Sequence, residues 1–273
     1  MSVVAVSAAH ARPRRAIRAS VGLWALSLAA ALAGAELVYH LVGLFWGAAC
    51  FAALFLAIVH CAVHVGSRGG GDLAPAALIA AASLVPLERL LVLGVPALSF
   101  LRLYPNALWV LPLGLAGAYA YRADWLPGAR PRLLRPPRPG WEPLAVQVAV
   151  VVAGAGLGVF AAHIVPYSGP HVLVHQDTAK WAGAVLFALA GGVEELAFRG
   201  VLQPITVNAI GPMGIAVSFL ASAYVSVAWM GLIAAAPVIV LSAITSVVVY
   251  RTRCLAGAVG GHVLLNLLLL MLR

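Results

Sequence analysis

The sequence has few charged residues. It contains 17 basic and 8 acidic residues in 273, or 9% of the chain, and only one of the basic residues is a lysine. Soluble globular proteins carry about 25% charged residues, so this chain cannot cover a water-facing surface with ionic groups. The three cysteines (Cys50, Cys61 and Cys254) are too few, and odd in number, for a disulfide framework. These scarcities exclude a soluble enzyme, a secreted disulfide scaffold and a disordered chain.

Hydrophobic residues make up 63% of the chain and gather in continuous runs. The runs cover residues 20–39, 42–64, 73–93, 105–121, 143–163, 180–203, 212–228, 230–250 and 254–272. Each is close to the ~20 residues with which a helix crosses about 30 Å of hydrocarbon. Continuous runs favour helices over the alternating segments of a barrel. The sequence predicts an all-α fold, a polytopic membrane helical bundle of eight or nine transmembrane helices.

The number of predicted spans depends on two positions at which the sequence does not clearly show whether one helix ends and another begins. Glu88 and Arg89 interrupt the third run, and Pro86 and Pro96 could break it into a short span and an interfacial helix. The break between the seventh and eighth runs is also weak.

The basic residues lie in clusters between the runs, so the net charge of +9 predicts membrane orientation and no nucleic-acid partner. The clusters are Arg12, Arg14, Arg15 and Arg18; Arg122, Arg130, Arg132, Arg135 and Arg138; and Arg251 and Arg253. Nine alternating spans place all three on the cytoplasmic side with the N-terminus. Residues 33–35 resemble a signal-peptide cleavage site, which leaves a processed N-terminus as an alternative. Because arginine outnumbers lysine and alanine is abundant, we expect a multi-pass protein of the bacterial inner membrane.

One segment, 123–142, is rich in arginine and proline, and we expect it to be a cytoplasmic linker. It would separate an N-terminal group of membrane helices, 1–122, from a C-terminal helical core, 143–273.

Two of the five glutamates, Glu194 and Glu195, are adjacent inside the run 180–203. A charge at membrane depth costs about 2.5–3.5 kcal/mol on insertion scales, so both carboxylates need partners or a wet cavity. Arg199 lies four residues after Glu195 on one helix face, whereas Glu194 has the apolar Phe198 at that spacing. We expect Glu195 to stay ionised, and Glu194 to face a cavity as a base that activates water. A structural ion pair between helices is the alternative.

A second polar pair, His262 and Asn266, lies four residues apart on the last run. Together they could hold an oxyanion, although a hydrogen bond between helices would explain them equally well. Gly260 and Gly261 would let another helix approach closely. Glu194 and His262 lie about nine and eight residues from the cytoplasmic ends of oppositely directed runs, roughly 12–14 Å deep at 1.5 Å per residue. We expect the two side chains to meet across one cavity.

These motifs resemble those of a known family. The residues EELAFR, beginning at Glu194, match the EExxxR motif of the CAAX-protease and bacteriocin-processing (CPBP, or Abi) family, and the last run resembles its HxxxN helix. The likeness covers about residues 143–273. The family consists of glutamic intramembrane proteases, so the resemblance implies hydrolysis of a peptide bond near the membrane surface. It implies that Glu194 is the water-activating base. Glu195 and Arg199 would hold its helix and tune its charge, and the oxyanion site would be His262 and Asn266.

One motif departs from the family pattern. The family carries FxxxH between these two motifs, and its histidine helps to position the water. Here no histidine lies between Arg199 and His262. Tyr224 stands where the phenylalanine belongs, which puts Ala228 in the place of the histidine. Either another group substitutes for it, or the protein no longer cleaves.

Other histidines are candidate substitutes. His60 and His64 lie one turn apart near the cytoplasmic end of the second run, where a solvated helix end explains them as well. Without a third ligand they predict no metal site. His163, His171 and His175 lie at or beyond the outer end of the fifth run, on the opposite side.

Three functions follow. The first is a membrane-embedded peptidase whose partners are lipid and a protein or peptide substrate near the membrane surface. The second is a non-catalytic scaffold of the same fold that binds a membrane partner. The third is a proton-coupled transporter, because buried carboxylates also mark ion pathways, although no paired discontinuous helices are visible. No cofactor motif is found, and no oligomeric state follows from the sequence.

Overall fold

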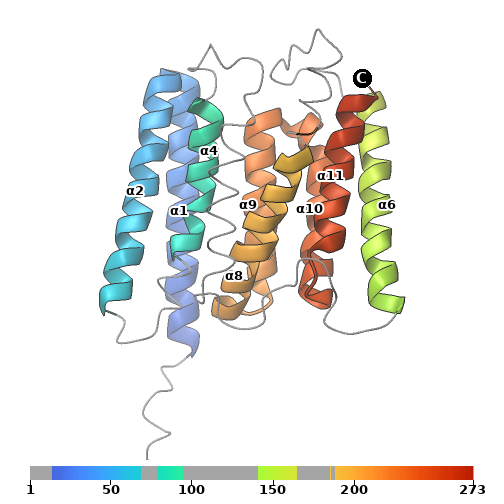
Figure 1. Ribbon diagram of the computed structural model, residues 1–273. Helices are drawn as coiled ribbons and strands as arrows, with labels where there is room; N and C mark the ends of the chain where they lie inside the picture. Colours follow the sequence, from blue (N-terminus) through green and yellow to red (C-terminus); the bar gives the residue numbers. More distant parts are fainter. Residues whose placement is uncertain (1–13, 69–78, 95–140, 165–184, 186–187, 273) are drawn as a thin grey trace, which may run out of the picture. The chain divides into compact units, whose positions relative to one another are not determined.

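The computed structural model describes residues 14–68, 79–94, 141–164, 185 and 188–272, and every element in these residues is a helix. The helices are α1 (Arg14–Val42), α2 (Leu44–Arg68), α4 (Leu84–Gly94), α6 (Trp141–Ile164), η3 (Leu196–Leu202), α8 (Gln203–Ile210), α9 (Met213–Met230), α10 (Leu232–Thr252) and α11 (Ala256–Met271) (Figure 1). The all-α fold class is therefore confirmed for these residues.

Among the described residues, three helices are long and apolar enough to cross a membrane: Leu44–Val65, Glu142–His163 and Leu232–Thr252. Three shorter helices, Leu26–Val42, Met213–Ala228 and Ala256–Met271, are also apolar. These helices indicate a membrane protein. The number of spans stays a prediction, because the run 105–121 and nearly all of the predicted linker lie outside the described residues.

The chain divides into two compact units, residues 1–50 and 51–273. In the first unit, Gly43 takes a φ of 118° and separates α1 from α2, a conformation that only glycine adopts without strain. On α1, His40 Nε2 lies 3.9 Å from Glu36 Oε2, and the side chain of His40 is 69% exposed. An exposed pair of this kind adds little to stability.

The third hydrophobic run is interrupted, as Pro86 predicts, whereas Pro96 lies outside the described residues. A short helical stretch ends before Ser83, and α4 begins at Leu84. Because Pro86 has no N–H, it cannot donate the helical hydrogen bond to the Ala82 carbonyl. At the break, Ser83 Oγ donates to the Ala80 carbonyl at 2.6 Å. With 11 residues, α4 is about 16 Å long, too short to cross a bilayer.

The break between α9 and α10 falls at Gly231, which takes a φ of 77°. The seventh and eighth runs are therefore separate helices.

The helices α6 and α11 pack backbone against backbone and run in the same direction (Figure 1). The Gly257 N–H donates to Gln147 Oε1 at 2.6 Å. Four residues further along α11, a Cβ on Gly261 would lie 2.8 Å from the Val150 carbonyl oxygen. As predicted, Gly261 lets another helix approach closely. This contact fixes the helix that carries His262.

Replacing Gly154 by alanine should cost about 1–3 kcal/mol of stability, because overpacking strains a close contact. The new methyl group would collide with the carbonyl of Gly261 on α11. The matched control is Gly156→Ala on the same helix, where an added Cβ meets nothing within 4 Å. Thermal unfolding in detergent should show a lower midpoint only for Gly154→Ala. Equal midpoints for the two variants would contradict the packing described.

Candidate active site

The adjacent glutamates lie on a helix that changes type at the site. Residues 188–195 are α-helical, Leu196–Leu202 form the π-helix η3, and α8 continues to Ile210. The helix therefore extends past residue 203, where the hydrophobic run ends, and stops at Gly211 with a φ of 70°. In η3 the Gln203 N–H donates to the carbonyl of Phe198, five residues earlier. Turns of this kind are rare and frequently occur at functional sites.

An ion pair between Glu195 and Arg199 forms the centre of the site. Glu195 Oε2 lies 3.4 Å from Arg199 Nε, and neither side chain has any exposed surface. The spacing predicted this pair on an α-helix. In an α-helix, a residue four positions further along lies slightly past one full turn, and in a π-helix it lies slightly short of one full turn. Glu195 and Arg199 therefore lie on nearly the same face in either geometry, and their side chains still meet. Each charge needs the other, because an unpaired charge buried this deeply is strongly destabilising.

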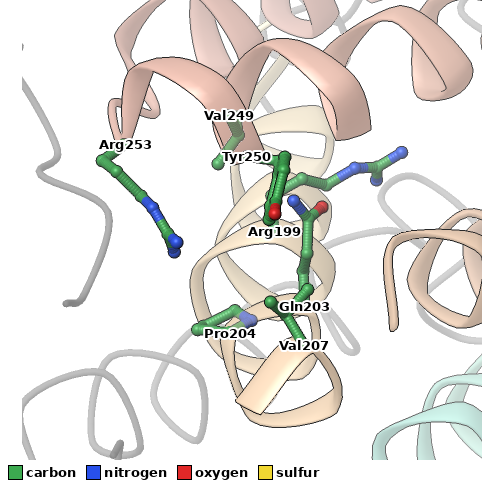
Figure 2. A pocket seen from close by; sticks show the side chains of 7 residues that line it. All are labelled: Arg199, Gln203, Pro204, Val207, Val249, Tyr250 and Arg253. Atoms are coloured by element: carbon green, nitrogen blue, oxygen red, sulfur yellow. The ribbon is translucent and has the colours of Figure 1, made fainter. Parts of the chain in front are cut away.

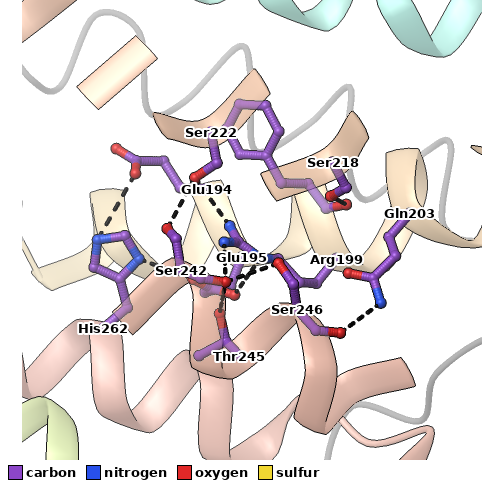
Figure 3. A network of polar contacts seen from close by, with 11 residues as sticks. Glu194, Glu195, Arg199, Gln203, Ser218, Ser222, Ser242, Thr245, Ser246 and His262 are labelled. Carbon is purple, nitrogen blue, oxygen red and sulfur yellow. Dashed lines mark hydrogen bonds and ion pairs between the residues drawn. The ribbon is translucent and has the colours of Figure 1, made fainter. Parts of the chain in front are cut away.

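His262 joins the last helix to both glutamates (Figure 3). Its Nδ1 lies 3.1 Å from Glu195 Oε1, and its Nε2 lies 3.7 Å from Glu194 Oε2. An ionised carboxylate can only accept, so Nδ1 donates its hydrogen to Glu195. This bond holds the imidazole ring with Nε2 facing Glu194. Glu195 therefore orients the histidine in addition to pairing with Arg199.

Asn266 lies one turn beyond His262 on α11 and is 3% exposed. Both residues pack over Gly191, where an added Cβ would lie 2.9 Å from Asn266 Nδ2 and from His262 Cδ2. A glycine at this position leaves the space that the two side chains occupy beside the helix of the glutamates. All five site residues predicted from the sequence thus lie in one buried region.

Two serines hold the other side of Arg199 (Figure 3). Arg199 Nη1 donates to Ser222 Oγ on α9, and Nη2 donates to the Ser242 carbonyl on α10, both at 3.1 Å. The two serine hydroxyls are themselves 3.1 Å apart. Sequence reasoning missed these residues, because a lone serine in an apolar run gives no distinct signal.

The position assigned to the missing histidine is turned away from this contact. Ser218 and Ser222 define the face of α9 that meets the glutamate helix, because Ser218 Oγ donates to the Phe198 carbonyl at 2.7 Å and Ser222 contacts Arg199. At about 100° per residue, Ala228 lies roughly 100° around the helix from the middle of that face. Ala228 is partly buried. A histidine there would not point with Ser222 toward the cluster.

The candidate substitute histidines lie at the surface or outside the described residues. His60 and His64 are exposed, with ring centroids 6.3 Å apart. His163 is exposed and bonds the Val159 carbonyl through Nδ1 at 2.8 Å. His171 and His175 lie outside the described residues. In the part of the chain that is described, no group of three potential metal ligands is found.

A small open hollow adjoins the cluster beyond Arg199 (Figure 2). Its lining residues are Arg199, Gln203, Pro204, Val207, Val249, Tyr250 and Arg253. Glu194 and His262 are not among them. As predicted, these two side chains meet, with His262 Nε2 3.7 Å from Glu194 Oε2. The cavity expected between them stays a prediction.

Glu88 is a further acidic residue of this region that sequence reasoning did not assign to the site. It lies on α4 and is 1% exposed. The rule that singled out Glu194, a charge inside an apolar run, applies to Glu88 equally well. In the sequence, Glu88 indicates only that the third run is interrupted and could form a short span and an interfacial helix.

The described helices and their buried ionic cluster define a helical membrane protein with a paired-glutamate site. Residues 176–268 match the protein-family model for type II CAAX prenyl endopeptidase Rce1-like proteins. The matched segment contains every predicted site residue, and it confirms the resemblance to the CPBP family. The match supports a membrane peptidase of the CPBP type. Searches found no matching curated protein and no matching solved structure.

Proposed function

We propose that the protein is a glutamic intramembrane peptidase that hydrolyses a peptide bond of a membrane-associated protein or peptide. The observation that carries the proposal is the 3.7 Å contact between Glu194 Oε2 and His262 Nε2. The two groups come from segments 68 residues apart and meet within the family-matched segment. A base beside a hydrogen-bond donor is what attack by water on a carbonyl requires.

In the proposed reaction Glu194 takes a proton from water while the water oxygen bonds to the carbonyl carbon of the substrate. The C=O electron pair moves to the oxygen, where the Nε2–H of a protonated His262 and the Asn266 amide stabilise the negative charge. The proton then passes from Glu194 to the amide nitrogen as the C–N bond breaks. The products are a carboxylic acid and an amine, and Glu194 returns to its starting state.

The lack of the family histidine favours a second function. The position assigned to the family histidine is Ala228, and α9 contains no histidine. A CPBP-type protein without that group could be a catalytically impaired scaffold that binds a membrane partner.

We further propose that the protein lies in a bacterial inner membrane with its N-terminus in the cytoplasm. The bond between Gly257 and Gln147 places the starts of α11 and α6 at the same end of the bundle. In the sequence, the arginines of the 122–142 segment precede α6, and Arg251 and Arg253 precede α11. The starts of α6 and α11 thus share one end, and each follows a basic segment in the sequence, which is the pattern that the positive-inside rule expects of cytoplasmic segments.

The test compares His262→Ala with His163→Ala, because His163 is an exposed histidine outside the cluster. Quantitative mass spectrometry of membrane-protein C-termini is run on cells that make the wild type, either variant or no protein. The wild type and His163→Ala should yield shortened C-termini that His262→Ala and the deletion lack. If all four strains show the same set of C-termini, the peptidase proposal is wrong and the scaffold function is favoured.

A further inference from the structure

A third buried carboxyl group lies in the electrostatic range of the proposed reaction centre and comes from outside the family-matched segment. Glu88 on α4 is 1% exposed, and its Oε2 has no hydrogen-bond partner among the described residues. Its carboxyl group interacts electrostatically with Glu194 and with Arg199. The helix α4 packs on α9, which supplies Ser222 to Arg199. The helix α4 thus brings an acid to the site.

The positive charges of the cluster are already committed to the other glutamates. Arg199 pairs with Glu195 at 3.4 Å and uses both terminal nitrogens on α9 and α10. His262 contacts Glu195 and Glu194. A third buried carboxyl group with an unpartnered oxygen lowers the stability of the fold. Packing alone would be served better by an apolar side chain of similar volume.

We propose that Glu88 holds the attacking water together with Glu194, in place of the histidine that α9 lacks. This inference rests on the proposed peptidase function. Glu88 Oε2 accepts a hydrogen bond from one O–H of the water, and Glu194 takes the other proton as the water oxygen bonds to the carbonyl carbon. Glu88 gains and loses no proton in this step. Its contribution is to aim the lone pair of the water oxygen.

The test measures kcat and KM of Glu88→Leu and Glu88→Gln on a synthetic peptide that spans the C-terminus processed in wild-type cells. Glu88→Leu should lower kcat by about 10²-fold, the lower end of the range for a positioned catalytic group. KM should not change. The midpoint of thermal unfolding should stay the same or rise, because a buried carboxyl group has been removed. Glu88→Gln keeps one acceptor oxygen, so its kcat should fall between those of Glu88→Leu and the wild type.

Glu142→Leu is the matched control, because Glu142 is an exposed glutamate at the start of α6. It should cleave at the wild-type rate. If Glu88→Leu does not fold, Glu88→Gln decides, and a folded Glu88→Gln with wild-type kcat overturns the inference.

Glu194→Gln separates the two proposals. If it abolishes cleavage while Glu88→Leu cleaves at the wild-type rate, the role of Glu88 is wrong and the peptidase function stands. If Glu194→Gln also cleaves at the wild-type rate, the proposed function itself fails.

Discussion

Replacing Glu194 by glutamine should lower the rate of substrate cleavage by about 10²–10⁴-fold, the contribution expected of a general base. The amide has nearly the shape of the carboxylate but cannot take a proton from water. The side chain is 7% exposed and contacts His262, so the substituted residue should keep its packing. Cleavage is followed in cells and with purified protein in detergent, and thermal unfolding checks that the fold is retained.

Two comparisons make the Glu194 result decisive. Glu142→Gln changes an exposed glutamate and should process substrate like the wild type. A Glu194→Gln protein that fully complements a deletion strain would show that the carboxylate is not the base. A protein that neither cleaves nor folds would instead indicate that the charge of Glu194 is structural, and the proposed role would have to be abandoned.

Replacing Arg199 by methionine should cost about 3–5 kcal/mol of stability, the amount typical of removing one partner from a buried ion pair. The change leaves the fully buried carboxylate of Glu195 without its 3.4 Å partner. It also removes the donors to Ser222 and to the Ser242 carbonyl. Thermal unfolding in detergent should show the loss. Arg253→Met is the control, because that arginine is only partly buried and lies over the Tyr250 ring at 5.4 Å.

A double variant tests the cause of this loss. Combining Arg199→Met with Glu195→Leu removes both charges, so the second substitution should recover part of the stability that the first one costs. If the two losses simply add, the ion pair is not the reason for the effect of Arg199→Met. A loss as large for Arg253→Met as for Arg199→Met would show that any arginine near the hollow has this effect.

Local spacing explains why part of the site could be predicted. Glu195 and Arg199 lie four residues apart, as do His262 and Asn266, and helices place such residues on one face. The contact between Glu194 and His262 was predicted from depth. Every helix that crosses the hydrocarbon core rises by the same length per residue. Two residues that lie equally many positions from the same membrane surface therefore lie at the same depth.

Other features depend on contacts between distant segments. The π-helical turn at Leu196–Leu202 changes the helix geometry between the glutamates and Gln203, and no residue in the run marks it. The orientation of α9 determined which residue meets Arg199, and it favours Ser222 over the Ala228 position. Glu88 is 106 residues before Glu194 in the chain, so only packing of α4 could relate them.

The amino-acid sequence alone determined the all-helical class, the membrane setting and the identity of the paired-glutamate motif, because each of these depends on composition or on spacing within one helix. The tertiary structure decided which helices pair and how their faces turn. It showed α6 and α11 in parallel contact through glycines, His262 shared by two glutamates, and a third glutamate nearby. The periodicity of the sequence defines which residues share a face of one helix. Which helices pack together depends on how well the side chains of two separate segments fit each other, and the pattern within one segment does not contain that information.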